Sequence, residues 1–203
     1  MPNYDYEKEY NEKGYKFICG VDEAGRGPLS GPVVAAACIL PIGLYIDGLN
    51  DSKKLSPKKR DEIFDVIKAN AVSYGIGTAS PKEIDEINIL NATMLAMHRA
   101  IDNLSVCADF ALVDGNIARG YDIPTLCIVK GDARSCSVAA ASILAKVTRD
   151  RICEEDAKKY PNYNFQKHKG YSTKEHMYLL RKYGPCEIHR KSFLKFLNEN
   201  EEK

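Results

Sequence analysis

Four acidic residues follow apolar segments that have the length and composition of strands. Asp22 and Glu23 follow the run 17–21, Asp114 follows 109–113, and Asp132 lies just beyond 123–129. Because functional side chains gather where strands end in an α/β sheet, these carboxylates are expected to lie together. Carboxylates at one place repel one another, and a divalent cation relieves that repulsion. The pattern predicts a site for Mg²⁺ or Mn²⁺, where two ions could bind the attacking and leaving oxygens of a phosphodiester.

Each acid also has a purely structural interpretation. Asp114-Gly115 is a common turn pair, and Asp132 could cap the helix that follows it. Neighbouring residues of a strand point to opposite faces, so Asp22 and Glu23 converge only if the strand ends there. Gly25 makes such a turn plausible. Acids at three predicted strand ends nevertheless favour a metal site over coincidence.

Apolar periodicity predicts the elements that would position these acids. Strands are expected over 17–21, 33–40, 71–79, 109–113 and 123–129, the first two antiparallel because a short segment joins them. Helices are expected over 57–70, as a short helix from 81 and a longer one over 88–104, over 134–158, and after Ser172 and Ser192. The order of elements predicts an α/β fold, with one mixed sheet and helices on both faces.

The composition is typical of one compact globular domain. The 203 residues are 44% hydrophobic and 28% charged, which argues against a disordered chain. Basic residues cluster at 53–60 and 158–195, which favours an anionic partner, although solvated helix faces would look the same. The seven cysteines form no CxxC pair, and neither a signal segment nor a membrane-spanning run is present. We expect a cytoplasmic protein.

The motifs around the acids resemble those of the ribonuclease HII family, the type 2 ribonucleases H. The resemblance runs from about residue 17 to 190 with the motifs in family order. It is carried by GVDEAGRGPL at 20–29, GPVVAA at 31–36, DSKKLS at 51–56, DGN at 114–116, KGD at 130–132, AASILAKVTRD at 140–150 and HKGY at 168–171.

This resemblance implies a fold, a cofactor and a reaction. The fold would be a ribonuclease H-like sheet flanked by helices, a single domain with a C-terminal helical appendage over about 160–203. Asp22, Glu23, Asp114 and Asp132 would be the catalytic acids and would bind Mg²⁺ or Mn²⁺. A monomeric enzyme would cut on the 5′ side of a ribonucleotide in RNA/DNA hybrids or in DNA with embedded ribonucleotides. The cut would leave 3′-hydroxyl and 5′-phosphate ends and would remove misincorporated ribonucleotides and RNA primers.

Further residues are expected to bind the substrate. The resemblance implies that Gly25, Arg26, Gly27 and Tyr171 sense the junction where RNA passes into DNA. Small residues around Arg26 leave the backbone bare, so that amides can approach a ribose, whose 2′-hydroxyl distinguishes RNA from DNA. Contacts to phosphates are expected from a second set, although exposed lysines are common without any such role. That set is Lys53, Lys54, Ser142 and Lys146.

Alternative functions share parts of this pattern. Type 3 ribonucleases H typically carry an added N-terminal domain and lack the arginine that is present here as Arg26. A junction resolvase or transposase would act on a duplex without any ribonucleotide. A non-catalytic duplex-binding module is disfavoured, because uncompensated acids near a phosphate backbone weaken binding.

Two C-terminal features favour no additional partner. His168, His176, Cys186 and His189 lie close in sequence, but their spacing fits no common zinc pattern. The last residues, 198–203, contain no apolar-aromatic docking motif, so binding to a sliding clamp is not expected.

Overall fold

Five strands form one mixed sheet in the computed structural model, which describes residues 1–197. The strands are β1 (Ile18–Ala24), β2 (Val33–Ile39), β3 (Ser73–Ala79), β4 (Phe110–Asp114) and β5 (Thr125–Ile128), in the order β3-β2-β1-β4-β5. β2 pairs antiparallel with both β1 and β3, whereas β4 lies parallel to β1 and β5 parallel to β4. The predicted antiparallel pairing of the first two strands is confirmed.

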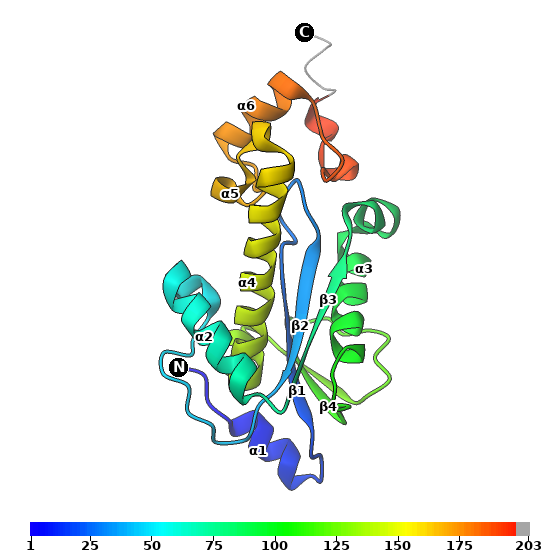
Figure 1. The fold of residues 1–203 in the computed structure, drawn as a ribbon. Coiled ribbons are helices and arrows are strands. Elements are labelled where there is room, and N and C mark those ends of the chain that lie inside the picture. The colour runs from blue at the N-terminus through cyan, green and yellow to red at the C-terminus, as the bar shows by residue number, and fades with distance from the viewer. Residues whose placement is uncertain (198–203) are drawn as a thin grey trace.

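Helices cover both faces of this sheet. The α-helices within residues 1–197 are α1 (Asp5–Glu12), α2 (Pro57–Asn70), α3 (Pro81–Asp102), α4 (Cys136–Lys159), α5 (Phe165–His168) and α6 (Lys174–Tyr183). Helices α2 and α4 lie on one side of the sheet, and α3 lies on the other (Figure 1). Short 3-10 turns occupy Ser52–Lys54, Gly131–Ala133, Pro161–Tyr163, Lys191–Phe193 and Lys195–Leu197. The predicted α/β class is confirmed.

Local sequence explains where two of these helices begin. The Ser56 side chain accepts from the amide of Lys59, and Ser80 forms a capping box with Glu83, each with proline at the start of the helix. Helix α3 contains a kink at Asn88, where φ is 67°. The kink explains why the sequence indicates a short helix followed by a longer one.

The close packing of α4 on β1 depends on small residues. A Cβ atom on Gly20 would lie 2.1 Å from the carbonyl carbon of Ser137, so no side chain fits between the strand and the helix. On the helix, Ala139, Ala140 and Ala141 are fully buried. Because α4 lies against the strand that carries Asp22 and Glu23, this contact fixes the scaffold of the acids.

Several predictions of local structure were wrong. Helix α1 was not predicted, because its hydrophilic sequence is anchored by a distant contact: Glu7 Oε1 accepts from Ser135 Oγ at 2.7 Å and from the amide of Ser137 at 3.0 Å. The expected last helix is two 3-10 turns. Asp132 does not cap α4, because that position belongs to Ser135.

Strand β1 continues past its predicted end. It pairs with β2 as far as Ala24 opposite Val34, so Asp22 and Glu23 both lie inside the strand. The strand end expected at the two acids is therefore wrong, but the chain does turn at Gly25, where φ is +97°.

Residues 160–197 pack as short helices at the far end of α4 (Figure 1). Tyr163, Phe165, Leu180 and Leu194 form an apolar cluster there, together with Leu29 from the loop after β1. The prediction about clamp docking concerned residues 198–203, which lie outside the described residues. None of the helices within 1–197 has the length and hydropathy needed to cross a membrane.

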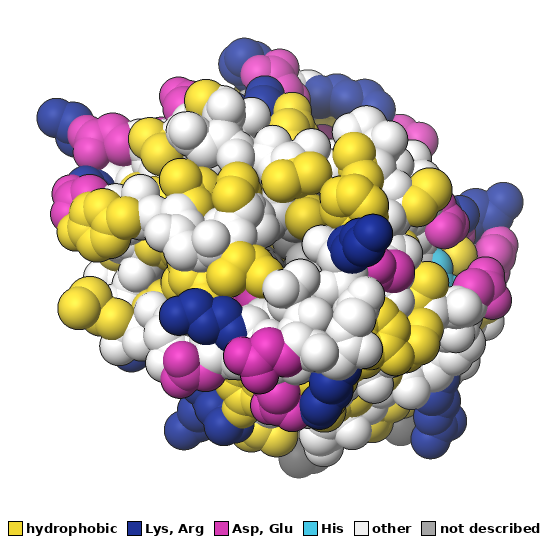
Figure 2. Space-filling model, turned by 90° about the horizontal axis from the view of Figure 1, so that it is seen from below, with side chains coloured by type: hydrophobic (Ala, Val, Ile, Leu, Met, Phe, Trp, Pro, Cys, Tyr) yellow, Lys and Arg dark blue, Asp and Glu magenta, His cyan; other side chains and the backbone are white. Residues whose placement is uncertain are grey.

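The opposite end of the molecule, near α1, carries charges of both signs around exposed apolar and uncharged side chains (Figure 2). Lysine and arginine are interspersed there with aspartate and glutamate. This end therefore does not present the one-signed basic surface that a phosphate backbone attracts.

Candidate active site

Segments that are far apart in the sequence bring the predicted acids to one end of the sheet. The parallel pairing of β1 with β4 sets Asp22 and Asp114 at the same level, one residue beyond the last pair. Asp132 lies in the 3-10 turn after β5, where the amide of Gly131 donates to Asp114 Oδ1 at 2.6 Å. Glu23 follows Asp22 in β1. The topology thus gathers the four acids that the sequence singles out.

Burial and mutual repulsion determine the electrostatics of this cluster. Asp22 is only 5% exposed, and its burial raises its pKa, with further increases from the charges of Glu23 and Asp114. Burial also raises the pKa of Glu23, although Arg26 opposes this effect from 3.4 Å away. The cluster therefore holds more negative charge than its neighbouring cation neutralises.

Asp51 joins the cluster, although the sequence reasoning did not single it out. Burial raises the pKa of Asp132, and the charges of Asp51 and Asp114 raise it further. Lys53 Nζ lies 3.9 Å from Asp132 Oδ2. Burial acts to lower the pKa of Lys53, but the charges of Asp132 and of the neighbouring acids outweigh it, so the pKa is raised. Asp51 opens a turn instead of ending a strand, so only its place in the DSKKLS motif could have indicated it.

Ser142 faces the acids from α4. Its hydroxyl is a hydrogen-bond partner of Asp22 that acts to lower the pKa of that carboxyl. The Oγ atoms of Ser142 and Ser52 lie 2.9 Å apart in a buried contact. Ser142 therefore supports the acid cluster and also ties it to the turn that carries Lys53.

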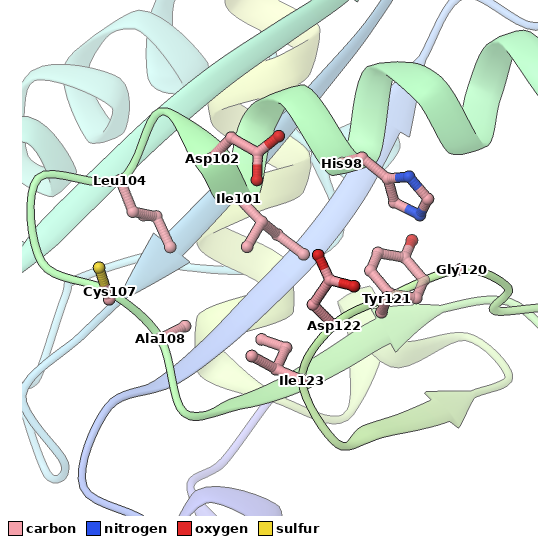
Figure 3. A pocket seen from close by; sticks show the side chains of 10 residues that line it. All are labelled: His98, Ile101, Asp102, Leu104, Cys107, Ala108, Gly120, Tyr121, Asp122 and Ile123. Carbon is pink, nitrogen blue, oxygen red and sulfur yellow. The ribbon is translucent and has the colours of Figure 1, made fainter.

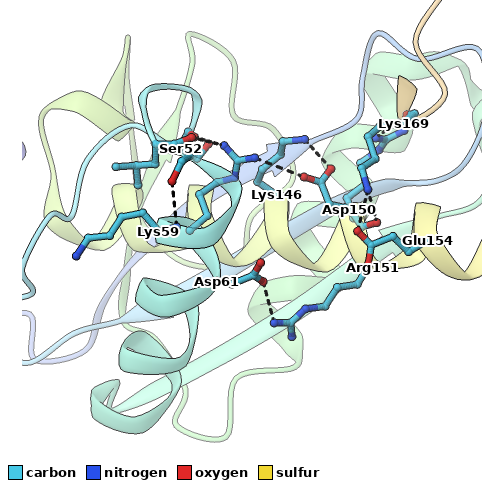
Figure 4. A network of polar contacts seen from close by, with 12 residues as sticks. Ser52, Lys59, Asp61, Lys146, Asp150, Arg151, Glu154 and Lys169 are labelled. Carbon is cyan, nitrogen blue, oxygen red and sulfur yellow. Dashed lines mark hydrogen bonds and ion pairs between the residues drawn. The ribbon is translucent and has the colours of Figure 1, made fainter. Parts of the chain in front are cut away.

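The other two predicted phosphate-binding residues are placed differently. Lys146 lines a hollow of about 580 Å³ between α2 and α4, where its Nζ lies 2.6 Å from Asp150 Oδ1 (Figure 4). Asp150 also faces Arg60 at 3.8 Å. Lys54 is exposed and makes no ion pair with the acids among residues 1–197. Of the predicted lysines, only Lys53 reaches the acid cluster directly.

The predicted substrate loop lies beside Tyr171. A Cβ atom on Gly27 would lie 3.7 Å from Tyr171 Cε1, and the amide of Leu29 donates to the carbonyl of Gly170 at 2.8 Å. Tyr171 is 46% exposed, so its ring is open to a ligand. The fold thus brings Gly25–Gly27 and Tyr171 to one surface next to the acids.

Two buried arginines beneath this loop were not singled out by the sequence reasoning. Arg149 is 1% exposed and Arg190 is 0% exposed. Both donate to backbone carbonyls of the loop between β1 and β2. Spacing gave no signal for them, because arginine is usually exposed and these partners are distant in sequence.

The C-terminal histidines also meet. The rings of His168 and His176 stack at 4.2 Å, and His176 Nε2 lies 3.0 Å from His189 Nε2. Cys186 Sγ lies 3.1 Å from His189 Nδ1. Burial lowers the pKa of both His176 and His189 to about 4, so both rings are neutral near pH 7. These residues form a hydrogen-bonded core of the C-terminal region.

Within residues 1–197, no group of three or more histidine, cysteine, aspartate or glutamate side chains is arranged to hold an ion. Asp114 Oδ1 accepts from the amide of Gly131, and Asp22 Oδ1 accepts from the amide of Glu23 at 2.7 Å. The donor set nevertheless fits a hard divalent cation, because it consists of carboxylates and because Asp22 is buried among other acids.

A separate hollow of about 360 Å³ lies between the C-terminal end of α3 and the loop that contains Tyr121 (Figure 3). Asp102 and Asp122 contribute carboxylates to it, and Ile101 and Ile123 contribute apolar side chains. None of the four predicted acids lines this hollow. It is therefore distinct from the candidate active site.

The mixed sheet and the acids at the ends of its central strands define a nuclease of the ribonuclease H class. The family model for ribonuclease HII matches residues 19–196, and the chain belongs to this family. It is accordingly an endoribonuclease of the ribonuclease H type, which acts on nucleic acid. The resemblance noted from the motifs, and the preference for type 2 over type 3, are confirmed.

Relatives match most of the chain. A ribonuclease HII from Acetivibrio thermocellus is 57% identical over 190 residues, covering 94% of this chain and 74% of that protein. One from Caldicellulosiruptor bescii is 55% identical, covering 95% of this chain and 93% of the relative. The crystal structure of the ribonuclease H2 from Pyrococcus horikoshii OT3 aligns with a TM-score of 0.71 at 29% identity, covering 87% and 93% of the two chains.

A more distant structure shares the fold alone. It is Bst-RNase HIII in complex with Mn²⁺, with a TM-score of 0.61 at 17% identity, covering 83% of this chain and 63% of that one.

Proposed function

We propose that this enzyme hydrolyses the phosphodiester on the 5′ side of a ribonucleotide, in RNA/DNA hybrids or in DNA with embedded ribonucleotides. The products would carry 3′-hydroxyl and 5′-phosphate ends. The observation that carries this proposal is that the acid cluster lies next to a loop whose Arg26 and Gly27 are exposed, and that an exposed tyrosine, Tyr171, lies beside this loop. Such an enzyme would remove misincorporated ribonucleotides and RNA primers, acting as a monomer in the cytoplasm.

Asp22, Glu23, Asp114 and Asp132 would hold divalent cations, Mg²⁺ or Mn²⁺. Bound ions of this kind lower the pKa of water and stabilise the charge on a departing oxygen. Support comes from the buried, mutually repelling carboxylates, whose charge a cation would offset. The distant relative crystallised with Mn²⁺ is consistent with this cofactor class.

The surrounding residues would position the duplex. The amides of Gly25, Arg26 and Gly27 would approach the ribose, whose 2′-hydroxyl is read without being the nucleophile. Tyr171 would stack on a sugar or base at the junction. Phosphates would be bound through Lys53, Lys54, Ser142 and Lys146, which fix the register without reading sequence.

One gel experiment tests this function. A DNA duplex with a single ribonucleotide is incubated with Mg²⁺, Mn²⁺ or EDTA, and the product ends are mapped. Cleavage 5′ of the ribonucleotide with either ion, and none in EDTA, is expected. The matched control is the same duplex with deoxyribose throughout, which should stay intact. Cleavage of that control, or products with a cyclic phosphate, would contradict the proposal.

A further inference from the structure

We infer that Arg149 and Arg190 are positioning residues that hold the Gly25–Gly27 loop and Tyr171 in the shape needed to read a ribonucleotide. This inference rests on the proposed function, which assigns ribose recognition to that surface. It adds two residues that touch neither the acids nor the proposed substrate directly.

The first observation is the burial of two guanidinium groups that form no ion pair. Arg149 and Arg190 are among the largest fully buried side chains of the molecule. Within residues 1–197, neither lies in an ion pair with a carboxylate. Burying a cation costs free energy unless hydrogen bonds replace its hydration shell. Here backbone carbonyls take that role.

Arg190 binds both ends of the loop that follows β1. Its Nη2 donates to the carbonyl of Gly25 at 2.6 Å, and its Nη1 donates to that of Arg26 at 2.9 Å. Its Nε donates to the carbonyl of Gly31 at 2.9 Å. A guanidinium has donors in a rigid planar fork, so these three bonds together fix the relative position of the two ends.

Arg149 binds the same loop from α4 and links it to Tyr171. Its Nη2 donates to the carbonyl of Ser30 and its Nε to that of Pro32, each at 3.3 Å. Its Nη1 donates to the carbonyl of Lys169 at 3.1 Å, two residues before Tyr171. The guanidinium carbon also lies 5.8 Å from the centre of the Tyr171 ring.

These bonds determine which backbone groups remain available to a ligand. The carbonyls of Gly25 and Arg26 are turned inward to Arg190. In contrast, no hydrogen bond within the described part of the chain engages the amides of residues 25, 26 and 27. Because the carbonyls are held inside, unpaired donors remain on a segment next to the acids. Hydroxyl and phosphate oxygens of a nucleic acid are acceptors that fit such donors.

The positive charges of Arg149 and Arg190 repel each other beneath the loop. Burial lowers the pKa of Arg190 to about 9, and the charge of Arg149 contributes to the decrease. An anionic strand at the outer surface of the loop would be attracted by both charges.

Lysine variants test the positioning role, because lysine keeps the positive charge of arginine but lacks its planar set of hydrogen-bond donors. For Arg190→Lys and Arg149→Lys, we expect kcat on a duplex with one ribonucleotide to fall by about a hundredfold, as misplacement of a reading surface would cause. The Kd for an all-DNA duplex of the same length, measured in EDTA, should change less than about threefold, because backbone attraction depends on charge. Assays are run well below the melting midpoint of each variant.

Two further variants separate positioning from stability. Arg99 also donates to a backbone carbonyl, that of Thr78 at 2.7 Å, but it lies on α3 away from the loop. Arg99→Lys should therefore lower the melting midpoint without changing kcat. Gly25→Ala would place a methyl group 2.0 Å from Arg149 Nε and displace the guanidinium without removing it. The inference requires this variant to lose kcat as well, so an unchanged kcat in folded Gly25→Ala would overturn it even if a lysine variant does not fold.

The outcomes distinguish this inference from the proposed function. If wild type cuts the ribonucleotide duplex and the folded lysine and Gly25→Ala variants cut it equally well, the arginines are only structural and the inference is overturned. A rise in the Kd for the all-DNA duplex as large as the fall in kcat would overturn it too. The variants would then have lost general electrostatic attraction for nucleic acid, not the positioning of the loop. If wild type leaves the ribonucleotide duplex intact, the proposed function fails and the inference falls with it.

Discussion

Acidification should destabilise this enzyme through its buried histidines. His176 Nδ1 lies 3.0 Å from the carbonyl of Tyr171 and must donate to it, so His176 Nε2 accepts from His189 Nε2 at 3.0 Å. The remaining nitrogen of His189, Nδ1, accepts from the amide of Cys186 at 2.9 Å. Every ring nitrogen is thus satisfied with both rings neutral. A proton added to His176 Nε2 or to His189 Nδ1 would face the donor from which that nitrogen now accepts.

The magnitude follows from the pKa values. Burial lowers the pKa of His176 and of His189 to about 4, from 6.5 in an exposed ring. Between these values the unfolded chain binds more protons than the folded chain, so stability decreases as the pH falls below 6.5. From pH 7.5 to 5, each histidine should remove about 2 kcal/mol of unfolding free energy. For a chain of this size, that lowers the melting midpoint by about 4–8 °C per histidine.

The assay compares wild type with His189→Asn, whose side-chain oxygen can still accept from the amide of Cys186. Melting midpoints are measured by circular dichroism at pH 7.5 and 5.0, in EDTA at constant ionic strength. The acid cluster acts in the opposite direction, because the raised pKa values of Asp22, Glu23 and Asp132 favour the folded state as the pH falls. That effect is common to both proteins and cancels in the difference. The variant should lose about 2 kcal/mol less than wild type on acidification. Equal losses in the two proteins would refute the reasoning.

Four other perturbations have defined outcomes. Asp22→Asn should abolish cleavage yet raise the melting midpoint in EDTA, because it removes a buried charge that neighbouring acids repel; a lower midpoint would contradict this account. Addition of Mg²⁺ or Mn²⁺ should raise the midpoint of wild type more than that of this variant, which differential scanning calorimetry can measure. Gly20→Ala should lower the free energy of unfolding, measured with urea, by about 3 kcal/mol, because the added methyl group would lie 2.1 Å from the backbone of α4. Glu7→Ala should lower the free energy of unfolding by about 2 kcal/mol in the same assay, because buried donors of Ser135 and Ser137 lose their acceptor. The control Glu9→Ala, at an exposed ion pair, should lower it by less than about 0.5 kcal/mol.

Local patterns were sufficient for most elements of the fold. The caps at Ser56 and Ser80 and the apolar run 33–40 report on bonds and burial within a few residues. Such signals can be read from a single sequence because the interacting groups are neighbours in it. Strand β1 and helix α1 were exceptions, since the end of β1 at Ala24 depends on pairing with β2 and α1 is anchored through Glu7 to Ser135.

The candidate site was predictable in part. The four acids could be singled out because three of the segments end as strands do, and the motifs added Gly25–Gly27 and Tyr171. Asp51 escaped because it begins a turn, and its nearness to Asp132 depends on how that turn folds over the sheet. The histidines and Cys186 were noticed, but their mutual hydrogen bonds could not be inferred from spacing.

The sequence alone determined the fold class, the family and four of the clustered acids, because hydrophobic periodicity and motif residues are local properties of the chain. Only the tertiary structure decided how Glu7 anchors α1 and how Arg190 holds the Gly25–Gly27 loop. Those contacts join residues 128 and 164 positions apart in the chain. No spacing rule reaches so far, since such contacts form only when the sheet and α4 have brought both partners together.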